Sequence, residues 1–157
     1  MNGKQPGSRN CFVCGRENPV SLKLDFYMDA PGEVRTTVFI PAHFEGYPGV
    51  VHGGVLASIL DETGGRALME DPNHFMVTAQ LNVRYRKPAP TETQLIALGW
   101  AGQRRGRVAE AHSELRTLEG VVLAEADLVM VDIPDDGMAA ADLEAMGWRV
   151  YLDEEEQ

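Results

Sequence analysis

The stretch Gly49-Val-Val-His52-Gly53-Gly54-Val-Leu-Ala-Ser-Ile-Leu-Asp61-Glu62-Thr-Gly-Gly65 decides the fold. It opens on a histidine and two glycines and then follows the 3.6-residue period of an α-helix. One face carries a bulky stripe suited to burial against a sheet, made of Leu56, Ile59, Leu60, Thr63 and Ala67. The opposite face carries small residues around one carboxylate, namely Gly54, Ala57, Ser58, Asp61, Gly64 and Gly65. We expect one long helix that ends near Glu70-Asp71, before Pro72.

The two acids of this helix differ in their neighbours. Glu62 lies four residues before Arg66, which is the spacing of an ion pair on a helix surface. Asp61 has no basic residue three or four positions away. The glycines beside it cost about 1 kcal/mol each in helix propensity relative to alanine, so they need a local reason. Small residues let another backbone or a ligand approach, and we therefore predict that Asp61 is the functional acid and Glu62 is not.

The start of the helix is the second candidate site. Gly53 and Gly54 follow His52 and leave the first helical N–H groups without carbonyl partners in the helix. Together with the helix dipole, these groups suit an anion or a polarised carbonyl oxygen. The alternative, that the glycines only permit tight helix–sheet packing, stays open here. Gly54 and Asp61 lie ~10 Å apart along the helix axis, too far to act on one atom, so the spacing indicates an active site built from two antiparallel chains.

The remainder of the chain alternates polar and apolar residues with a period of two. This pattern predicts strands over 22–28, 34–40, 75–85, 93–104, 107–117 and 121–132. Turn residues at 30–32, 106 and 119–120 predict hairpins. Two strands, one helix and four further strands predict an α+β fold, in which an antiparallel sheet of about six strands covers a central helix. A short helix over 138–146 and a solvated acidic tail from Asp153 are expected to follow.

Length and charge limit the classes of function. The chain has 157 residues, which fits one main domain over 22–134, with an N-terminal extension over 1–21 and a C-terminal segment over 135–157. A net charge of −10 argues against a nucleic-acid partner. No apolar run is long enough to cross a membrane, and the first residues lack the apolar core of a signal peptide. We expect a cytoplasmic protein with no membrane partner.

The two cysteines form Cys11-Phe-Val-Cys14-Gly15. Such a pair is half of a zinc site, and a second pair does not follow. A redox motif is expected at a strand-to-helix turn of a βαβ unit, whereas Gly15 and Asn18-Pro19 are turn residues. We expect a reduced structural knuckle and no metal. A zinc ion completed by His43, His74 or another chain is the open alternative.

These motifs resemble the hotdog-fold acyl-CoA thioesterases of the PaaI type. The resemblance covers about 22–132 and rests on Gly49-Val-Val-His52-Gly53-Gly54, on Asp61 nine residues after the histidine, and on Thr78-Ala-Gln-Leu-Asn82-Val-Arg-Tyr85 before a proline. A subgroup of these proteins also carries the N-terminal Cys-x-x-Cys-Gly. The resemblance implies a hotdog fold, in which a curved antiparallel sheet wraps a long central helix, and an active homodimer or a dimer of such dimers.

The resemblance also implies roles for individual residues. The Gly54 amide would polarise the thioester carbonyl, and His52 would help to position that end of the site. Asp61 of the opposite subunit would act as nucleophile or general base, and Thr78 would orient the attacking water. Some relatives carry asparagine at the position of Gly46. This chemistry needs an oxyanion donor and a base, and no cofactor.

A second group of residues is predicted to bind acyl-CoA. Arginine and lysine suit the phosphates of coenzyme A, and they cluster at 84–87 and 104–107. Solubility of strand ends and of a hairpin tip would explain the same clusters. The predicted substrate-binding residues are Gly53, Glu45, Asn82, Arg84, Arg86, Lys87 and Arg105. The competing functions are a non-catalytic acyl-CoA-binding protein and an acyl-thioester hydratase or dehydratase of the same fold.

Overall fold

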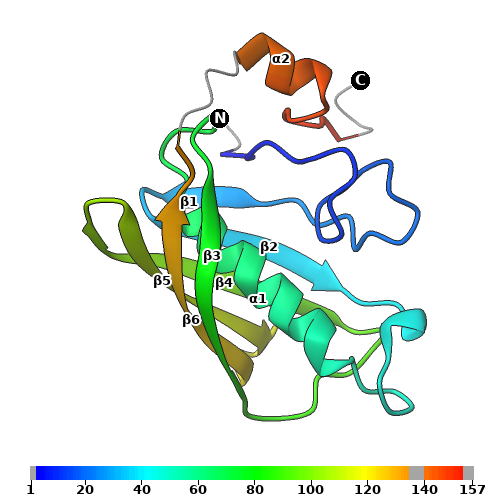
Figure 1. Cartoon of the computed structure of the whole chain (residues 1–157). Helices are drawn as coiled ribbons and strands as arrows, with labels where there is room; N and C mark the ends of the chain where they lie inside the picture. Colours follow the sequence, from blue (N-terminus) through cyan, green and yellow to red (C-terminus); the bar gives the residue numbers. More distant parts are fainter. Residues whose placement is uncertain (1–2, 135–139, 154–157) are drawn as a thin grey trace.

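The central element is the helix α1 (Gly53–Ala67), which the computed structural model places across one face of a curved sheet (Figure 1). The structure describes residues 3–134 and 140–153. The predicted bulky stripe of Leu56, Ile59, Leu60, Thr63 and Ala67 is buried throughout. The helix ends before the predicted Glu70-Asp71, because the N–H groups of Leu68 and Met69 bond to carbonyls three residues back and tighten the chain into a turn.

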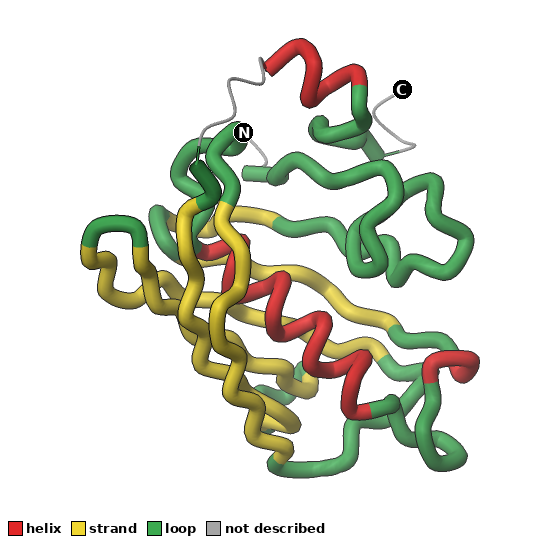
Figure 2. Tube along the Cα trace, viewed as in Figure 1, coloured by secondary structure: helices red, strands yellow, loops and turns green. Residues whose placement is uncertain are grey.

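The sheet has six antiparallel strands in the order β1-β2-β4-β5-β6-β3. They are β1 (Tyr27–Ala30), β2 (Glu33–Phe39), β3 (Met76–Tyr85), β4 (Gln94–Arg105), β5 (Val108–Thr117) and β6 (Val122–Asp132). A short 3₁₀ helix, η1 (Ala42–Phe44), begins the loop that leads to α1. The sheet curls around one helix (Figure 2), as the period-two pattern and the hairpin turns predict, so the fold class is confirmed.

The first predicted strand is shorter than expected. Leu22, Leu24 and Phe26 are buried as predicted, but only residues from Tyr27 onward belong to a strand. Lys23 has a φ of 54°, which interrupts an extended chain. The N–H groups of Leu22 and Leu24 bond to Phe12 and Val13 of the N-terminal extension. This segment therefore holds the extension instead of lengthening the hairpin.

A bulge in β3 changes which side chains face the helix. Regular alternation would place Thr78 on the same side as Gln80 and Asn82. The pairing with β6 instead shifts between Thr78 and Gln80, and Thr78 lies opposite Met130, whose side chain is buried under α1. Cross-strand partners share a face, so Thr78 faces the helix. The predicted alternation is wrong for the first part of β3, where Val77 is 51% exposed.

The two ends of the chain meet on one side of the molecule (Figure 1). Gly7 pairs with Arg149, and the Lys4 ammonium lies 2.8 Å from the Asp153 carboxylate. Within the predicted helix over 138–146, the structure has α2 (Ala140–Ala145), while 135–139 lie outside the described residues. Asp153, the first residue of the predicted solvated tail, is ion-paired and keeps 46% of its side chain exposed, and 154–157 also lie outside the described residues. Among the described residues, no helix is long and apolar enough to cross a membrane.

Candidate active site

The start of α1 is capped by its own histidine. His52 is the N-cap residue, and its Nδ1 accepts a hydrogen bond of 2.9 Å from the Gly54 N–H. The Tyr85 hydroxyl donates to the Gly53 carbonyl at 2.7 Å and ties the end of β3 to the helix start. We refer to His52, Gly53, Gly54 and Tyr85 as the amide end. Tyr85 closes the sequence motif before the proline, but no role for it follows from the sequence.

A cleft of about 610 Å³ lies at the amide end. Its lining combines apolar and basic side chains, including Tyr47, Val50, Leu56, Tyr85, Arg86 and Lys87. Glu45 does not line this cleft, and its carboxylate accepts from the Gly49 N–H at 3.0 Å, so it fastens the loop that forms one wall. Gly46 packs against His52, where a methyl group would lie 3.4 Å from the His52 Cα.

Asp61 and Thr78 meet about halfway along the helix. The Thr78 hydroxyl donates to Asp61 Oδ1 at 2.7 Å, which the bulge in β3 makes possible. We refer to this pair as the acid end. It lines a second cavity of about 250 Å³ together with residues of the N-terminal extension and of β6, among them Cys11, Cys14 and Met130. The two cavities share no lining residue, so one chain does not bring the amide end and the acid end together.

The small-residue face of α1 has two different uses. At Gly64, a methyl group would come within 2.5 Å of Leu128 Cδ1, and at Gly65 within 3.1 Å of Met130 Cε. These two glycines therefore let the helix approach β6 of its own chain, which supplies the local reason for their cost in helix propensity. Ala57, Ser58 and Asp61 are only half-buried and remain on the open part of this face.

Glu62 pairs with Arg66 as predicted, with 2.8 Å between Arg66 Nη2 and Glu62 Oε1. The pair does not lie on the surface, because the N-terminal extension covers it: the Arg66 side chain is only 5% exposed and also donates to the Pro6 carbonyl. Arg66 stacks over Trp148, with its guanidinium carbon 5.4 Å from the ring centroid. The expectation that Glu62 contributes only a surface pair is therefore wrong.

The predicted substrate-binding residues in β3 and just after it do not gather in one place. Arg86 and Lys87, which follow the end of β3, line the cleft at the amide end, and the Arg86 guanidinium also bonds to Glu125 at 3.2 Å. Asn82 and Arg84 lie on the face of the sheet opposite α1, where Arg84 forms ion pairs with Glu125 at 3.1 Å and Asp127 at 2.7 Å. The hydrogen bond from Arg86, with the nearby charge of Arg84, holds the pKa of Glu125 below its usual range.

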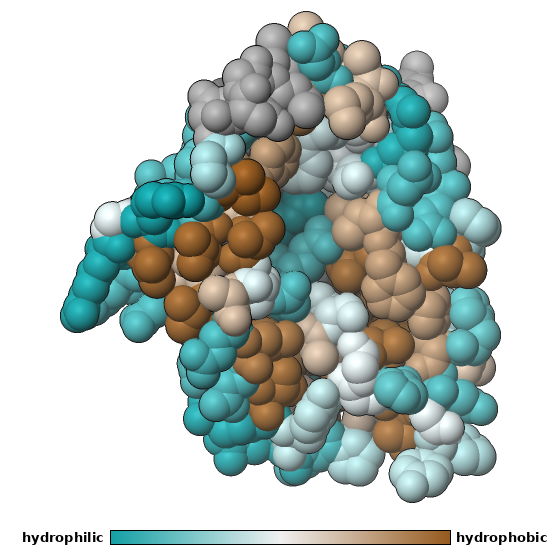
Figure 3. Space-filling view, viewed as in Figure 1, coloured by the Kyte–Doolittle hydropathy of each residue, from teal (hydrophilic) through white to brown (hydrophobic). Residues whose placement is uncertain are grey.

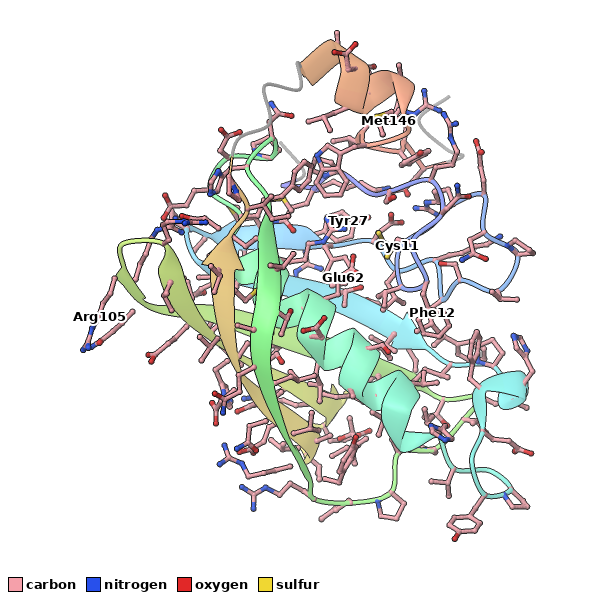
Figure 4. The ribbon with its side chains drawn as sticks, viewed as in Figure 1. Cys11, Phe12, Tyr27, Glu62, Arg105 and Met146 are labelled. Atoms are coloured by element: carbon pink, nitrogen blue, oxygen red, sulfur yellow. The ribbon has the colours of Figure 1, made fainter. Side chains whose placement is uncertain are left out.

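Arg105 lies at the tip of the β4–β5 hairpin and bonds to Gln103 at 3.1 Å (Figure 4). It belongs to neither cavity of its own chain.

Known proteins match the part of the chain that carries both ends of α1. The family model described as Thioesterase superfamily matches residues 48–124. The matched residues are just under half of the chain and include α1, β3, β4 and β5. Acyl-coenzyme A thioesterase THEM4 of Rattus norvegicus is 44% identical over 48 residues, which are 31% of this chain and 20% of that protein. The THEM4 protein of Mus musculus matches to the same extent. This chain thus matches about a fifth of the length of these thioesterases.

Solved structures of thioesterases share the architecture. One thioesterase superfamily protein is 33% identical with a TM-score of 0.73, covering 79% of this chain and 61% of that one. A thioesterase protein of Streptococcus pneumoniae TIGR4, solved with coenzyme A, is 20% identical with a TM-score of 0.64, covering 70% and 85%. A Streptococcus mutans UA159 protein bound to acetyl CoA is 19% identical with a TM-score of 0.65, covering 75% and 94%. The hotdog fold is confirmed, while the PaaI-type subgroup with its cysteine motif stays a prediction.

Proposed function

We propose that this protein acts as a member of the thioesterase superfamily and hydrolyses acyl-CoA thioesters to a free acid and coenzyme A, in sites that two copies of the chain form together. One observation carries the proposal: the amide end and the acid end lie at opposite ends of β3. Thr78, near the start of β3, bonds to Asp61, and Tyr85, the last residue of β3, bonds to Gly53. β3 is also an edge strand that pairs only with β6 among the described residues.

An edge strand of ten residues offers a row of backbone groups for pairing. Antiparallel pairing of β3 with a second β3 about a two-fold axis would set the Thr78 end of one chain beside the Tyr85 end of the other. Each cleft at an amide end would then meet the acid end of the partner. Apolar residues gather along this side of the molecule (Figure 3), with Val77 51% and Tyr85 54% exposed, which favours a covered surface.

The proposed chemistry divides between the two chains. The Gly54 N–H would donate to the thioester oxygen, where negative charge develops in the transition state. His52 holds this N–H at 2.9 Å in the free protein, so the imidazole would act as a placeholder that the substrate carbonyl displaces. Asp61 of the partner would attack the carbonyl carbon or take a proton from the attacking water, and the Thr78 hydroxyl would hold one of its oxygens. The thiolate of coenzyme A would then leave.

The substrate class follows from the lining of the cleft and from the relatives. Val50, Leu56 and Tyr85 offer an apolar wall to an acyl chain, and Arg86 and Lys87 offer cations to phosphate oxygens. The relatives include proteins named as acyl-coenzyme A thioesterases and structures with coenzyme A or acetyl CoA. No cofactor is required, so activity should survive dialysis against a chelator.

The test is hydrolysis of a panel of acyl-CoAs, followed by detection of the released thiol. The wild-type protein should turn over at least one chain length. Asp61→Asn should lower kcat by at least ~100-fold, because the amide is neither a strong base nor a nucleophile. Asp71→Asn is the matched control, since it makes the same change at an exposed position outside both cavities.

Each competing function has its own outcome in this assay. A non-catalytic acyl-CoA-binding protein would bind the panel and release no thiol. A hydratase or dehydratase would change the acyl chain and leave the thioester intact. Equal activity in Asp61→Asn and in wild type would remove Asp61 from the mechanism.

A further inference from the structure

The Cys11-Phe-Val-Cys14 turn packs directly against α1, beside the acid end. Cys11 and Glu62 point toward one another in Figure 4, and Cys11 Sγ donates to Glu62 Oε2 at 3.2 Å. The two sulfur atoms and the Glu62 carboxylate lie within 4.8 Å of one another. All three residues line the cavity of about 250 Å³, which gives a small molecule access to the pair. The proposed hydrolysis uses neither cysteine.

The two thiols are chemically unequal. Cys11 is half-buried, and its sulfur accepts from the N–H groups of Val13 at 3.3 Å and Cys14 at 3.4 Å. A hydrogen bond from the Cys14 thiol, helped by these two N–H groups, lowers the pKa of Cys11, while burial and the Glu62 charge oppose the shift. Cys14 is 3% exposed, and its donation to Cys11, together with burial, raises its pKa. Cys11 is therefore the more reactive thiol and Cys14 the sheltered one.

A fixed cation already bonds to Cys14 and Glu62. Arg66 Nη2 donates both to Cys14 Sγ at 3.2 Å and to Glu62 Oε1 at 2.8 Å. The Arg66 side chain is 5% exposed and carries its charge at every ordinary pH. A second cation beside this guanidinium would be repelled, so the cluster suits thiol chemistry better than a metal site.

Turn geometry favours a bond between the sulfurs. The Gly15 N–H bonds to the Cys11 carbonyl at 2.8 Å, which closes a single turn around the pair. Residues three apart in one turn have Cα atoms within the ~4.4–6.8 Å that a disulfide spans. At Gly15 a methyl group would come within 2.6 Å of the Cys11 nitrogen, so the glycine keeps the turn closed.

We propose that Cys11 and Cys14 are a dithiol–disulfide site that exchanges with low-molecular-weight disulfides, with Cys11 as the attacking thiol, Cys14 as the resolving thiol, and Glu62 as the residue that retains the Cys11 proton. The Cys11 thiolate attacks the small disulfide and releases one thiolate, which leaves a mixed disulfide on Cys11. The Cys14 sulfur then attacks Cys11 Sγ and gives up its proton to the second leaving thiolate. One small disulfide is reduced to two thiols, and one protein disulfide forms.

The experiment uses the full chain, reduced, freed of reductant and incubated with glutathione disulfide, followed by thiol titration and intact mass measurement. Wild type should lose both thiols and carry no glutathione. Cys14→Ser should hold one glutathione on Cys11, because nothing resolves the adduct. Cys11→Ser should react at least ~10-fold more slowly than Cys14→Ser, since Cys14 is buried. The corresponding alanine variants repeat the comparison if a serine variant does not fold.

Three outcomes would overturn the proposal. In the first, the folded wild-type protein keeps both thiols in glutathione disulfide, while the unfolded protein loses them. The second is Cys11→Ser reacting as fast as Cys14→Ser. The third is about one zinc per chain in elemental analysis of the reduced protein, which would make the knuckle a metal site.

Glu62→Gln tests the proposed role of Glu62, which is to retain the Cys11 proton. Removing the carboxylate should speed alkylation of Cys11 by about threefold to tenfold, because lowering a thiol pKa by one unit raises its thiolate fraction by up to tenfold. Glu119→Gln is the matched control, because Glu119 is an exposed residue of the β5–β6 turn. An unchanged or slower rate in Glu62→Gln would overturn the role of Glu62.

Discussion

The amide end and the acid end are built in opposite ways. The amide end is made by a loop and a strand end close to the helix start, is largely apolar, and opens into a cleft. The acid end lies beside buried charges that the N-terminal extension and Trp148 cover, more than 50 residues away in the chain. The His52-Gly53-Gly54 part of the amide end can therefore be recognised from a short motif, whereas the surroundings of the acid end need the tertiary structure. We expect the two ends to act together in catalysis and to differ in their tolerance of substitutions.

Complementation has the largest expected effect. Asp61→Asn and Gly54→Pro should each be inactive, the second because proline removes the N–H of position 54. Mixed and reassociated, they should regain about a quarter of wild-type activity, because half of the dimers are heterodimers with one intact site each. The measurement is thiol release after the variants have been dissociated and refolded together.

Gly54→Ala is the control for that experiment, because it keeps the N–H and its new methyl group would meet only the His52 ring at 3.2 Å. Gly54→Pro must also be shown to fold and to pair. With folding and pairing established, a mixture that stays inactive would mean that both ends act within one chain, and the shared-site proposal would fail.

Replacing glycine by alanine should affect stability differently at Gly64, on the helix face beside the acid end, and at Gly54, in the amide end. Gly64→Ala should lower the free energy of unfolding by about 1–3 kcal/mol, because its methyl group would overlap the buried Leu128 side chain. Gly54→Ala should stay within about 1 kcal/mol of wild type, since alanine favours a helix and only a mobile ring lies near. Denaturant unfolding measures both variants. Equal destabilisation would mean that the two glycines serve the same packing role.

Thr78→Val should have a smaller effect on the acid end. It removes the donor to Asp61 at 2.7 Å while keeping the side-chain shape, so kcat/KM should fall about threefold to tenfold, the value of one hydrogen bond. Thr78→Ser keeps the hydroxyl and should retain most of the activity. A serine variant as weak as the valine variant would show that the methyl group, and not the hydroxyl, matters.

His112 belongs to neither end and serves as a reference. Burial would lower its pKa, but hydrogen bonds with Asp127 at 2.8 Å and Glu114 at 3.2 Å outweigh burial and raise it. The folded state thus binds the proton more tightly than the unfolded chain. This stabilisation is complete below about pH 6.5 and is lost as the pH rises through the folded pKa.

His112→Gln should therefore lower the Tm more at about pH 6 than at about pH 8, with little change in catalysis. Thermal unfolding at the two pH values checks the expectation. A Tm difference that grows toward the higher pH would contradict the raised pKa.

How much the sequence could predict depends on where the interactions lie. The bulky stripe of α1, the strand pattern after Pro72 and the pairing of Glu62 with Arg66 follow from local spacing, and the structure confirms them. The burial of that pair does not follow, because residues 3–26 cover it from a distant part of the chain. Lys23 interrupts the first strand through a positive φ that a lysine codes only weakly.

The outcome at Thr78 has a similar cause. The face of the sheet on which Thr78 lies depends on one unpaired residue in β3. Periodicity alone places Thr78 on the wrong face.

That unpaired residue, Ala79, determines which kinds of mutation would disturb the acid end. Because the bulge depends on the number of residues between Thr78 and Leu81, many substitutions at position 79 would leave Thr78 facing Asp61, whereas loss of the Ala79 codon would turn it to the other side of the sheet. The hydrogen bond from Thr78 to Asp61 thus depends more on the number of residues in β3 than on which residue occupies position 79. An in-frame deletion of this codon should therefore remove the hydrogen bond. The assay for Thr78→Val would register the deletion as the same loss of activity.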